Sequence, residues 1–333
     1  MGNARGVLYG LAFGDAYGYP TEFLKVPEIL KLYPPDGPQD LKSITVSDDT
    51  QMALAVSRAL VQTERFDVAT LEPILRKEFI EWSNSEENTR APGMTCMRAC
   101  EKLEQGLPWI KATEMGSKGC GANMRVAPVG LLNLPIETRA GLAQFQAALT
   151  HGHPTALAAS DATAQAVYFL MHGIAPERLL QTLLDYAEAQ LGMYHQDWLG
   201  DLWEESQHPA AAYFIARGWR ETMDALLRVK EALKNPDFDT DPCLLTGPGW
   251  IAEEALATGL YCFLLHPENP REALKRAAVS SGDSDSIACL TGSFLGAYLG
   301  DGGFPSDWFE RIEYRAELER LARALPLKHE VLV

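Results

Sequence analysis

Two short acidic clusters carry the residue types that bind hard metal ions. They read Ser47-Asp48-Asp49-Thr50 and Asp283-Ser284-Asp285-Ser286, and each stands where a helical pattern of apolar residues begins. Carboxylate and hydroxyl oxygens suit Mg²⁺, Mn²⁺ or Ca²⁺, whereas zinc would require histidine or cysteine at defined spacing. Asp283 and Asp285 are two positions apart, so an extended lead-in to the helix would point both carboxylates to the same side.

If the two clusters meet in the fold, four carboxylates share one pocket and repel each other unless cations neutralise them. We therefore predict a site for two metal ions. A simpler interpretation remains open, because Ser and Asp are also common N-caps that accept hydrogen bonds from the free amides of a helix start. Capping, however, requires only one residue per helix.

Three further segments carry groups that could face the same pocket. Gly116 to Gly121 precedes a predicted helix, so its amides could cradle a diphosphate, although a flexible surface loop is the alternative. The turn from Gly14 to Glu22 could place the Glu22 carboxylate over the pocket or could simply be solvated. His151 precedes a predicted helix start and could form a hydrogen bond with a ligand or with the backbone.

These segments need a scaffold, and the apolar pattern predicts one made of helices. Apolar residues recur at helical spacing through most of the chain, and strict alternation is almost absent. We predict an all-α protein, a compact orthogonal multi-helix bundle, with one domain over residues 1–333. Segments rich in small residues, such as 156–166 and 292–297, predict closely packed central helices. The predicted helices span residues 50–64, 67–83, 93–105, 122–133, 153–173, 175–190, 209–233, 250–265, 270–280, 285–300 and 305–324.

Composition limits the classes of function. The 333 residues include 29 Lys+Arg and 45 Asp+Glu, for a net charge of -16, and 47% of them are hydrophobic. These proportions are typical of a globular enzyme, and the negative charge disfavours nucleic acids and anionic membranes as partners. Six cysteines without a CxxC pair favour the reducing cytoplasm. Neither a signal peptide nor an apolar stretch of about 18 residues is apparent.

Taken together, the segments resemble the successive signatures of the ADP-ribosylglycohydrolase family. In chain order the matching stretches are GDAYGYPTE, SDDTQMAL, GSKGCGANMRVAPVG, LTHGHP, GPGWIAEEALATGLY and SSGDSDSIACLTGSFLGAYLG. They extend over most of the chain. The resemblance implies an all-α bundle with a central binuclear Mg²⁺ site, in which Mn²⁺ could substitute.

The resemblance also implies a role for each matching residue. The implied metal ligands are Ser47, Asp48, Asp49, Asp283, Asp285 and Ser286, with Thr common in relatives at the two serine positions. The candidate catalytic residues are Glu22, Asp48, Asp49 and Asp283, one of which would take the proton of the attacking water, and the sequence does not choose among them. The implied contacts to ADP-ribose come from Gly116, Ser117, Lys118, Gly119, Cys120, Gly121, Met124 and His151. Lys118 and Cys120 replace an aromatic residue and an asparagine that several relatives carry.

The implied activity is Mg²⁺-dependent hydrolysis that removes ADP-ribose from a modified acceptor, most simply an ADP-ribosylated arginine on a protein. Such a monomeric enzyme would release ADP-ribose and reverse a regulatory modification or neutralise a toxin. The alternative is a catalytically silent ADP-ribose-binding or structural member of the same fold. An isoprenoid synthase is disfavoured because Asp48-Asp49 does not begin a DDxxD motif, and a His-Asp phosphohydrolase because its histidines are missing.

Overall fold

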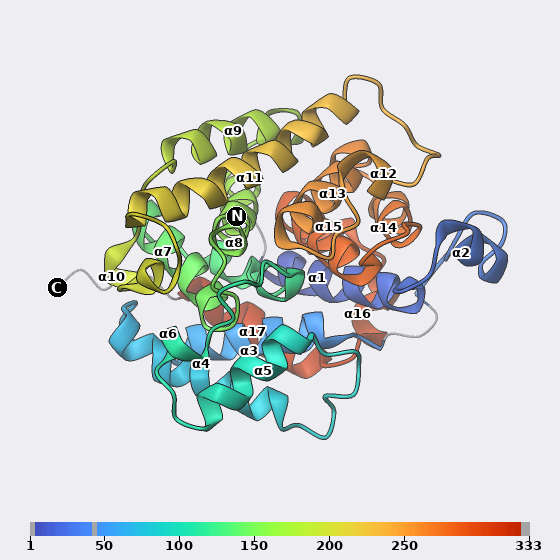
Figure 1. The fold of residues 1–333 in the computed structure, drawn as a ribbon. Helices are drawn as coiled ribbons and strands as arrows, with labels where there is room; N and C mark the ends of the chain where they lie inside the picture. The colour runs from blue at the N-terminus through green and yellow to red at the C-terminus, as the bar shows by residue number, and fades with distance from the viewer. Residues whose placement is uncertain (1–3, 42–44, 328–333) are drawn as a thin grey trace.

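Helices make up the regular secondary structure of the computed structural model, which describes residues 4–41 and 45–327 (Figure 1). The α-helices are α1 (Ala4–Gly18), α2 (Val26–Leu32), α3 (Asp48–Gln62), α4 (Val68–Ser83), α5 (Met94–Glu104), α6 (Trp109–Ala112), α7 (Ile136–Ala148), α8 (Pro154–Met171), α9 (Pro176–Ala189), α10 (Gln196–Leu199), α11 (Ala211–Ala232), α12 (Cys243–Thr246), α13 (Ala252–Leu265), α14 (Pro270–Ala278), α15 (Ser284–Leu299), α16 (Ser306–Arg311) and α17 (Arg315–Ala324). Short 3₁₀ segments are η1 (Tyr19–Thr21), η2 (Cys120–Ala122), η3 (Ala127–Leu131), η4 (Leu202–Glu205), η5 (Asp301–Gly303) and η6 (Leu325–Leu327). Across the described ranges, β-type pairing is limited to two isolated bridges. The prediction of an all-α fold is confirmed.

One predicted helix, over residues 122–133, is wrong. The segment instead forms η2 and η3, separated by a turn. Pro128 lies in its middle, where a helix would require an amide hydrogen and where the proline ring would clash with the carbonyl of Met124. The glycine-rich segment before it therefore does not lead into an α-helix, and the helix-dipole argument for a diphosphate cradle does not apply there.

Helix α7 lies outside all the predicted ranges for a different reason. Its residues from Arg139 to Ala148 are all buried, so the helix has no continuous polar face. A helix that is enclosed on nearly every side loses the periodicity from which helices are predicted. The predicted helix 305–324 is also divided, because Tyr314 takes a left-handed conformation between α16 and α17.

The central element of the bundle is an antiparallel pair formed by α1 and α15. Glycines recur every fourth residue along α1, and each faces a small residue of α15. At Gly10, an added Cβ atom would lie 2.2 Å from the carbonyl oxygen of Gly292, and at Gly14 it would lie 1.9 Å from that of Ala288. The two backbones are therefore in direct contact, and no side chain separates them.

This helix pair brings distant parts of the sequence to one place. The C-terminal end of α1 packs beside the start of α15, since an added Cβ at Gly18 would lie 2.3 Å from the carbonyl oxygen of Ser284. The hydroxyls of Thr21 and Ser284 are 3.0 Å apart, and both contact the carbonyl oxygen of Gly18. The turn that carries Glu22 is thus held against the segment that carries Asp283 and Asp285.

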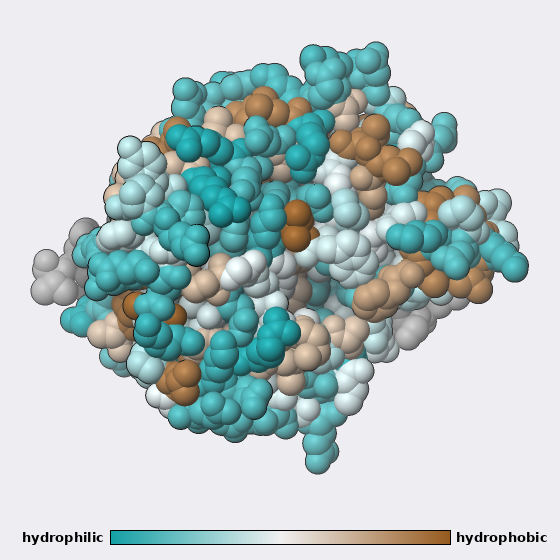
Figure 2. All heavy atoms as spheres, viewed as in Figure 1, coloured by the Kyte–Doolittle hydropathy of each residue, from teal (hydrophilic) through white to brown (hydrophobic). Residues whose placement is uncertain are grey.

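The outer face is largely polar. In the view of Figure 2, hydrophilic residues dominate and hydrophobic residues occur in small groups. Among the described residues, no helix combines the length and apolar character needed to cross a bilayer.

The contact between α1 and α15 predicts an unusual response to a glycine substitution. Alanine in place of glycine inside an exposed helix normally stabilises it by about 1 kcal/mol. In Gly292→Ala the new Cβ would lie 1.9 Å from the Gly10 carbonyl oxygen, so we expect unfolding free energy to fall by about 3 kcal/mol because the helices must separate. Chemical denaturation measures this.

Gly302→Ala is the matched control, because a Cβ at Gly302 meets no atom within 4 Å. We expect this variant to unfold like the wild type. Equal stability of Gly292→Ala and the wild type would contradict the proposed backbone contact.

Candidate metal centre

The two acidic clusters meet at one cleft of about 360 Å³. Its acidic wall comes from three segments: the turn after α1, the start of α3 and the start of α15. The side chains of this wall are Glu22, Asp48, Asp49, Asp283, Asp285 and Ser286. One carboxylate oxygen each of Glu22, Asp283 and Asp285 lies within 4.8 Å of the other two. The convergence on which the predicted metal site depends is therefore present.

The two helix starts use their first residues differently. Ser47 is the N-cap of α3, and its buried hydroxyl accepts a hydrogen bond from the Asp49 amide at 3.2 Å. It is the one predicted ligand that does not line the cleft. Asp283 is the N-cap residue of α15, yet its side chain makes no capping hydrogen bond. The capping interpretation thus explains Ser47 and leaves the Asp283 carboxylate available to a ligand.

Asp15, which the sequence analysis did not select, holds the first cluster in place. This fully buried residue of α1 accepts hydrogen bonds from the Ser47 amide at 2.9 and 3.0 Å, and from the Thr50 amide at 3.0 Å. The Thr50 hydroxyl donates to the same carboxylate. Burial, together with the charge of Asp285, raises the pKa of Asp15 to about 7. The signal in the sequence was an acidic residue in the interior of an otherwise apolar helix.

Mutual repulsion marks the acidic wall as a place for positive charge. Burial, followed by the charges of Asp285 and Asp48, raises the pKa of Glu22 to about 9. Burial and neighbouring carboxylates also raise the pKa values of Asp48, Asp49 and Asp283 well above the ordinary range. The buried Asp49 Oδ2 has no hydrogen-bond partner in the part of the chain that the structure describes. This donor set of carboxylates and a serine hydroxyl fits a hard divalent cation such as Mg²⁺ or Mn²⁺.

The opposite wall of the cleft contains only part of the predicted ADP-ribose contacts. Gly119, Cys120, Gly121, Met124 and His151 line it, whereas Gly116, Ser117 and Lys118 are outside its described lining. The loop is fixed by two backbone hydrogen bonds, from the Cys120 amide to the Trp250 carbonyl at 3.1 Å and from the Ala252 amide to the Lys118 carbonyl at 2.9 Å.

Lys118 directs its ammonium group away from the expected position. It donates to Glu221 at 2.8 Å and to the buried carboxylate of Glu253. The charge of the Lys118 ammonium group is thus already compensated by two carboxylates. A contact from Lys118 to a phosphate would require it to leave these ion pairs. Ser117 is not part of this lining, but its hydroxyl lies 2.9 Å from that of Thr95, which does line the cleft.

Two aromatic rings stand at the mouth of the cleft. Phe23 and Trp250 stack with ring centroids 5.5 Å apart and an interplanar angle of 19°. Both line the cleft, yet their side chains are exposed, at 64% and 41%. Phe23 also has a φ of 64°, and Ala91 on the same rim has a φ of 52°. Strained non-glycine residues of this kind persist mainly at functional sites.

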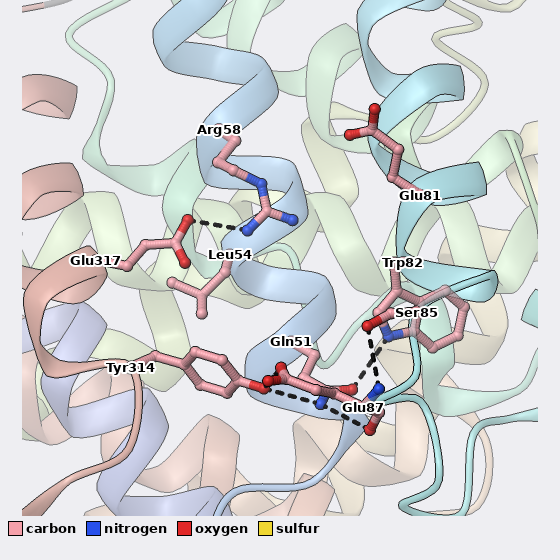
Figure 3. Close-up of a pocket in the computed structure, with 9 residues that line it drawn as sticks. All are labelled: Gln51, Leu54, Arg58, Glu81, Trp82, Ser85, Glu87, Tyr314 and Glu317. Atoms are coloured by element: carbon pink, nitrogen blue, oxygen red, sulfur yellow. Dashed lines mark hydrogen bonds and ion pairs between the residues drawn. The ribbon is translucent and has the colours of Figure 1, made fainter.

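A second cavity, of about 210 Å³, lies between α3, α4 and the start of α17 (Figure 3). Gln51 links its walls, since it donates to the Tyr314 hydroxyl at 3.1 Å and accepts from the Trp82 indole at 3.3 Å. None of the predicted metal ligands, all of which are described, lines this cavity. The acidic cleft is therefore the candidate site.

Comparisons with known proteins agree with this geometry. A family model described as ADP-ribosylglycohydrolase matches residues 2–331. The mouse ADP-ribosylhydrolase ARH3 is 26% identical, with 96% of this chain and 90% of that protein covered. The ADP-ribosylarginine hydrolase Tri1 of Serratia proteamaculans is 24% identical, with 98% and 79% covered. A solved structure titled ADP-ribosylglycohydrolase-related protein complex superposes with a TM-score of 0.69 at 28% identity, covering 97% of this chain and 96% of that chain.

The position of Asp15 predicts that it supports metal binding without being a ligand. In Asp15→Asn the new amide group would face backbone N–H donors, so we expect about 2 kcal/mol less stability. Because the Ser47 to Thr50 segment would lose its anchor, the affinity for Mg²⁺ should fall about tenfold or more. Calorimetric titration with Mg²⁺ measures the affinity.

Asp161→Asn provides the control. Asp161 is equally buried and its pKa is likewise raised to about 7, but its partners are Gln144 and Tyr186, outside the cleft. This variant should lose stability and keep its Mg²⁺ affinity. If both variants bind Mg²⁺ as the wild type does, Asp15 has no role in holding the site.

Proposed function

Because the chain belongs to the ADP-ribosylglycohydrolase family, we propose that it hydrolyses the bond between ADP-ribose and a modified acceptor. The acceptor in this proposal is an arginine side chain of a protein. The observation that carries the proposal is the convergence of Glu22, Asp48, Asp49, Asp283 and Asp285 on one cleft from three separate segments. Free ADP-ribose and the unmodified acceptor would be the products.

In the proposal, two Mg²⁺ ions are held by carboxylate and hydroxyl oxygens at the two helix starts, with Mn²⁺ as a substitute. The residues that line the cleft and would hold them are Asp48, Asp49, Asp283, Asp285 and Ser286, while Ser47, also implied by the resemblance, caps α3 behind them. When bound, the ions would supply positive charge that fixes the ribose hydroxyls and stabilises the charge that develops as the bond breaks. Two observations on the described residues support this assignment. Asp49 Oδ2 is buried without a hydrogen-bond partner, and the Asp283 side chain forms no capping hydrogen bond at the start of α15.

The protein itself would supply the proton transfer. A water molecule must lose a proton as its oxygen bonds to the anomeric carbon of the ribose. The released arginine side chain must gain a proton as its bond to that carbon breaks. The candidate proton acceptors are Glu22, Asp48, Asp49 and Asp283. We assign the role to Glu22, because it is half-buried while the three aspartates are buried. Bound cations would offset the neighbouring negative charges that raise its pKa, so that its carboxylate could accept the proton.

The mouth of the cleft supports arginine as the acceptor. A planar guanidinium stacks favourably on the face of an aromatic ring, and the exposed Trp250 and Phe23 present such faces beside an acidic wall. A neutral serine acceptor would gain no comparable interaction. The relative named as an ADP-ribosylarginine hydrolase agrees with this preference.

The proposal also includes the setting of the reaction. Residues 1–333 act as one domain and as a monomer in the cytoplasm, where the six free cysteines would remain reduced. The biological outcome would be reversal of a regulatory modification or neutralisation of a toxin.

The proposed activity is tested by release of ADP-ribose from proteins modified on arginine. We expect release with Mg²⁺, none in excess EDTA, and recovery when Mg²⁺ is restored. Asp283→Ala should lower the rate by about 100-fold or more, since charge stabilisation in the transition state is lost. Full turnover in excess EDTA would contradict the proposal. Binding of ADP-ribose without release from any linked substrate would favour the catalytically silent alternative.

The proposed arginine preference predicts a selective effect of Trp250→Ala. For arginine-linked ADP-ribose we expect kcat/KM to fall about fivefold to tenfold, because a cation–π contact is lost. For a serine-linked substrate and for the binding of free ADP-ribose, we expect little change. An equal loss for both linkages would show that Trp250 does not discriminate between acceptors.

A further inference from the structure

Arg125 is a fully buried cation without an anionic partner. No carboxylate of the described residues forms an ion pair with it, and its side chain is 0% exposed. Its Nε donates to Gln146 Oε1 at 2.8 Å, and Nη2 donates to the Gln146 carbonyl at 2.7 Å. The partners of Nη1 among the described residues are the sulfur atoms of Met52 and Cys96, and the guanidinium lies over the Phe79 ring. A buried charge held by neutral groups is costly, so this arrangement requires an explanation.

The remaining partner of Arg125 is the hydroxyl of Thr150. Nη2 donates to Thr150 Oγ1 at 2.8 Å, so that oxygen accepts a charge-assisted hydrogen bond. The hydroxyl proton has two acceptors within reach, His151 Nδ1 at 2.8 Å and the Ala147 carbonyl at 3.4 Å. That carbonyl already accepts from the amides of Thr150 and His151, at 3.1 and 2.8 Å. The shorter bond, to His151 Nδ1, is therefore favoured.

The direction of this bond determines where His151 carries its proton. If Nδ1 accepts, the ring proton of the neutral imidazole is on Nε2. Burial, together with the charge of Arg125, holds the pKa of His151 well below its ordinary value, so the ring is neutral. An added Cβ at Gly119 would lie 3.3 Å from Nε2, and one at Gly121 would lie 3.5 Å from it. Nε2 therefore faces the part of the glycine loop that lines the cleft.

We propose that Arg125 acts through Thr150 as a positioning residue that fixes His151 in the Nε2–H tautomer, so that Nε2 donates to an oxygen of the ligand beside Gly119 and Gly121. The identity of that ligand as ADP-ribose rests on the proposed function, and the oxygen would belong to its diphosphate or ribose. No other described residue forms a hydrogen bond with Nε2, so this donor is available to the ligand.

The choice of arginine follows from the same geometry. Arg125 keeps its charge under all ordinary conditions and presents several donors in a fixed plane. It can therefore donate hydrogen bonds to Gln146 and Thr150 together. Because a guanidinium cannot accept a hydrogen bond, the Thr150 hydroxyl must direct its own proton elsewhere. A carboxylate near Thr150 would compete with His151 for the hydroxyl proton. The neutral surroundings of Arg125 exclude that competition.

The tautomer is measured directly by ¹⁵N NMR of the full chain labelled at histidine, with the His151 signals assigned by their loss in His151→Gln. In the wild type we expect an unprotonated Nδ1 and a protonated Nε2. Thr150→Val removes the donor to Nδ1, so the Nδ1 signal should lose its hydrogen-bond shift and a mixture of tautomers should form. Thr150→Ser should restore the wild-type spectrum. Arg125→Met should resemble Thr150→Val if it folds.

Affinity for ADP-ribose, measured by calorimetry, provides the second readout. Because a single buried hydrogen bond becomes poorly formed, we expect Thr150→Val to weaken binding about tenfold, and Thr150→Ser to recover it. A protonated Nδ1 in the wild type would overturn the proposal whatever the enzyme hydrolyses. Wild-type affinity in Thr150→Val would overturn it as well. Failure of the proposed function would instead appear as the expected tautomer in a protein that does not bind ADP-ribose.

Discussion

The structure depends on the confinement of several carboxylates within one cleft. Charges of the same sign at this separation destabilise the folded chain unless positive charge or hydrogen-bond donors offset them. Backbone amides donate hydrogen bonds to the Asp15 carboxylate, and the neutral Ser47 hydroxyl caps the start of α3. The other acids, with their raised pKa values, keep oxygens directed into the cleft. A cation at this position would stabilise the fold and also act on a substrate.

The close packing of α1 and α15 makes this confinement possible. Because glycine backbones touch along the pair, the ends of the two helices cannot shift relative to each other without opening the core. Both acidic ends are therefore fixed by backbone contacts at successive glycines of α1, from Gly6 to Gly18. The same rigidity places Glu22 beside Asp285 despite a separation of more than 260 residues. A longer side chain at any of these contacts would increase the distance between the acids.

Residues that lie in continuous sequence motifs were more predictable than the residues that hold those motifs in place through distant partners. The metal-type donors, the glycine loop and His151 are recognisable because each motif is continuous in the chain. Asp15 and Arg125 were not selected, since their roles depend on partners that are 32 and 25 positions away. The ion pairs of Lys118 could not be predicted for a related reason, because Glu221 and Glu253 approach it only in the fold. Residues 122–133 failed as a helix because one proline outweighed an apolar pattern.

Hydrogen-bond partners separate two kinds of buried acid in this protein. The carboxylates of Asp15 and Asp161 accept bonds from fixed donors, so they organise the chain around them. Asp49 has an oxygen without a partner, and Asp283 caps a helix by position while its side chain does not. Since a buried oxygen without a donor is costly, its retention is best explained by a ligand. On the opposite wall, His151 Nε2 forms no hydrogen bond with any described residue and faces the loop beside the cleft, so in our proposal one bound molecule contacts both walls.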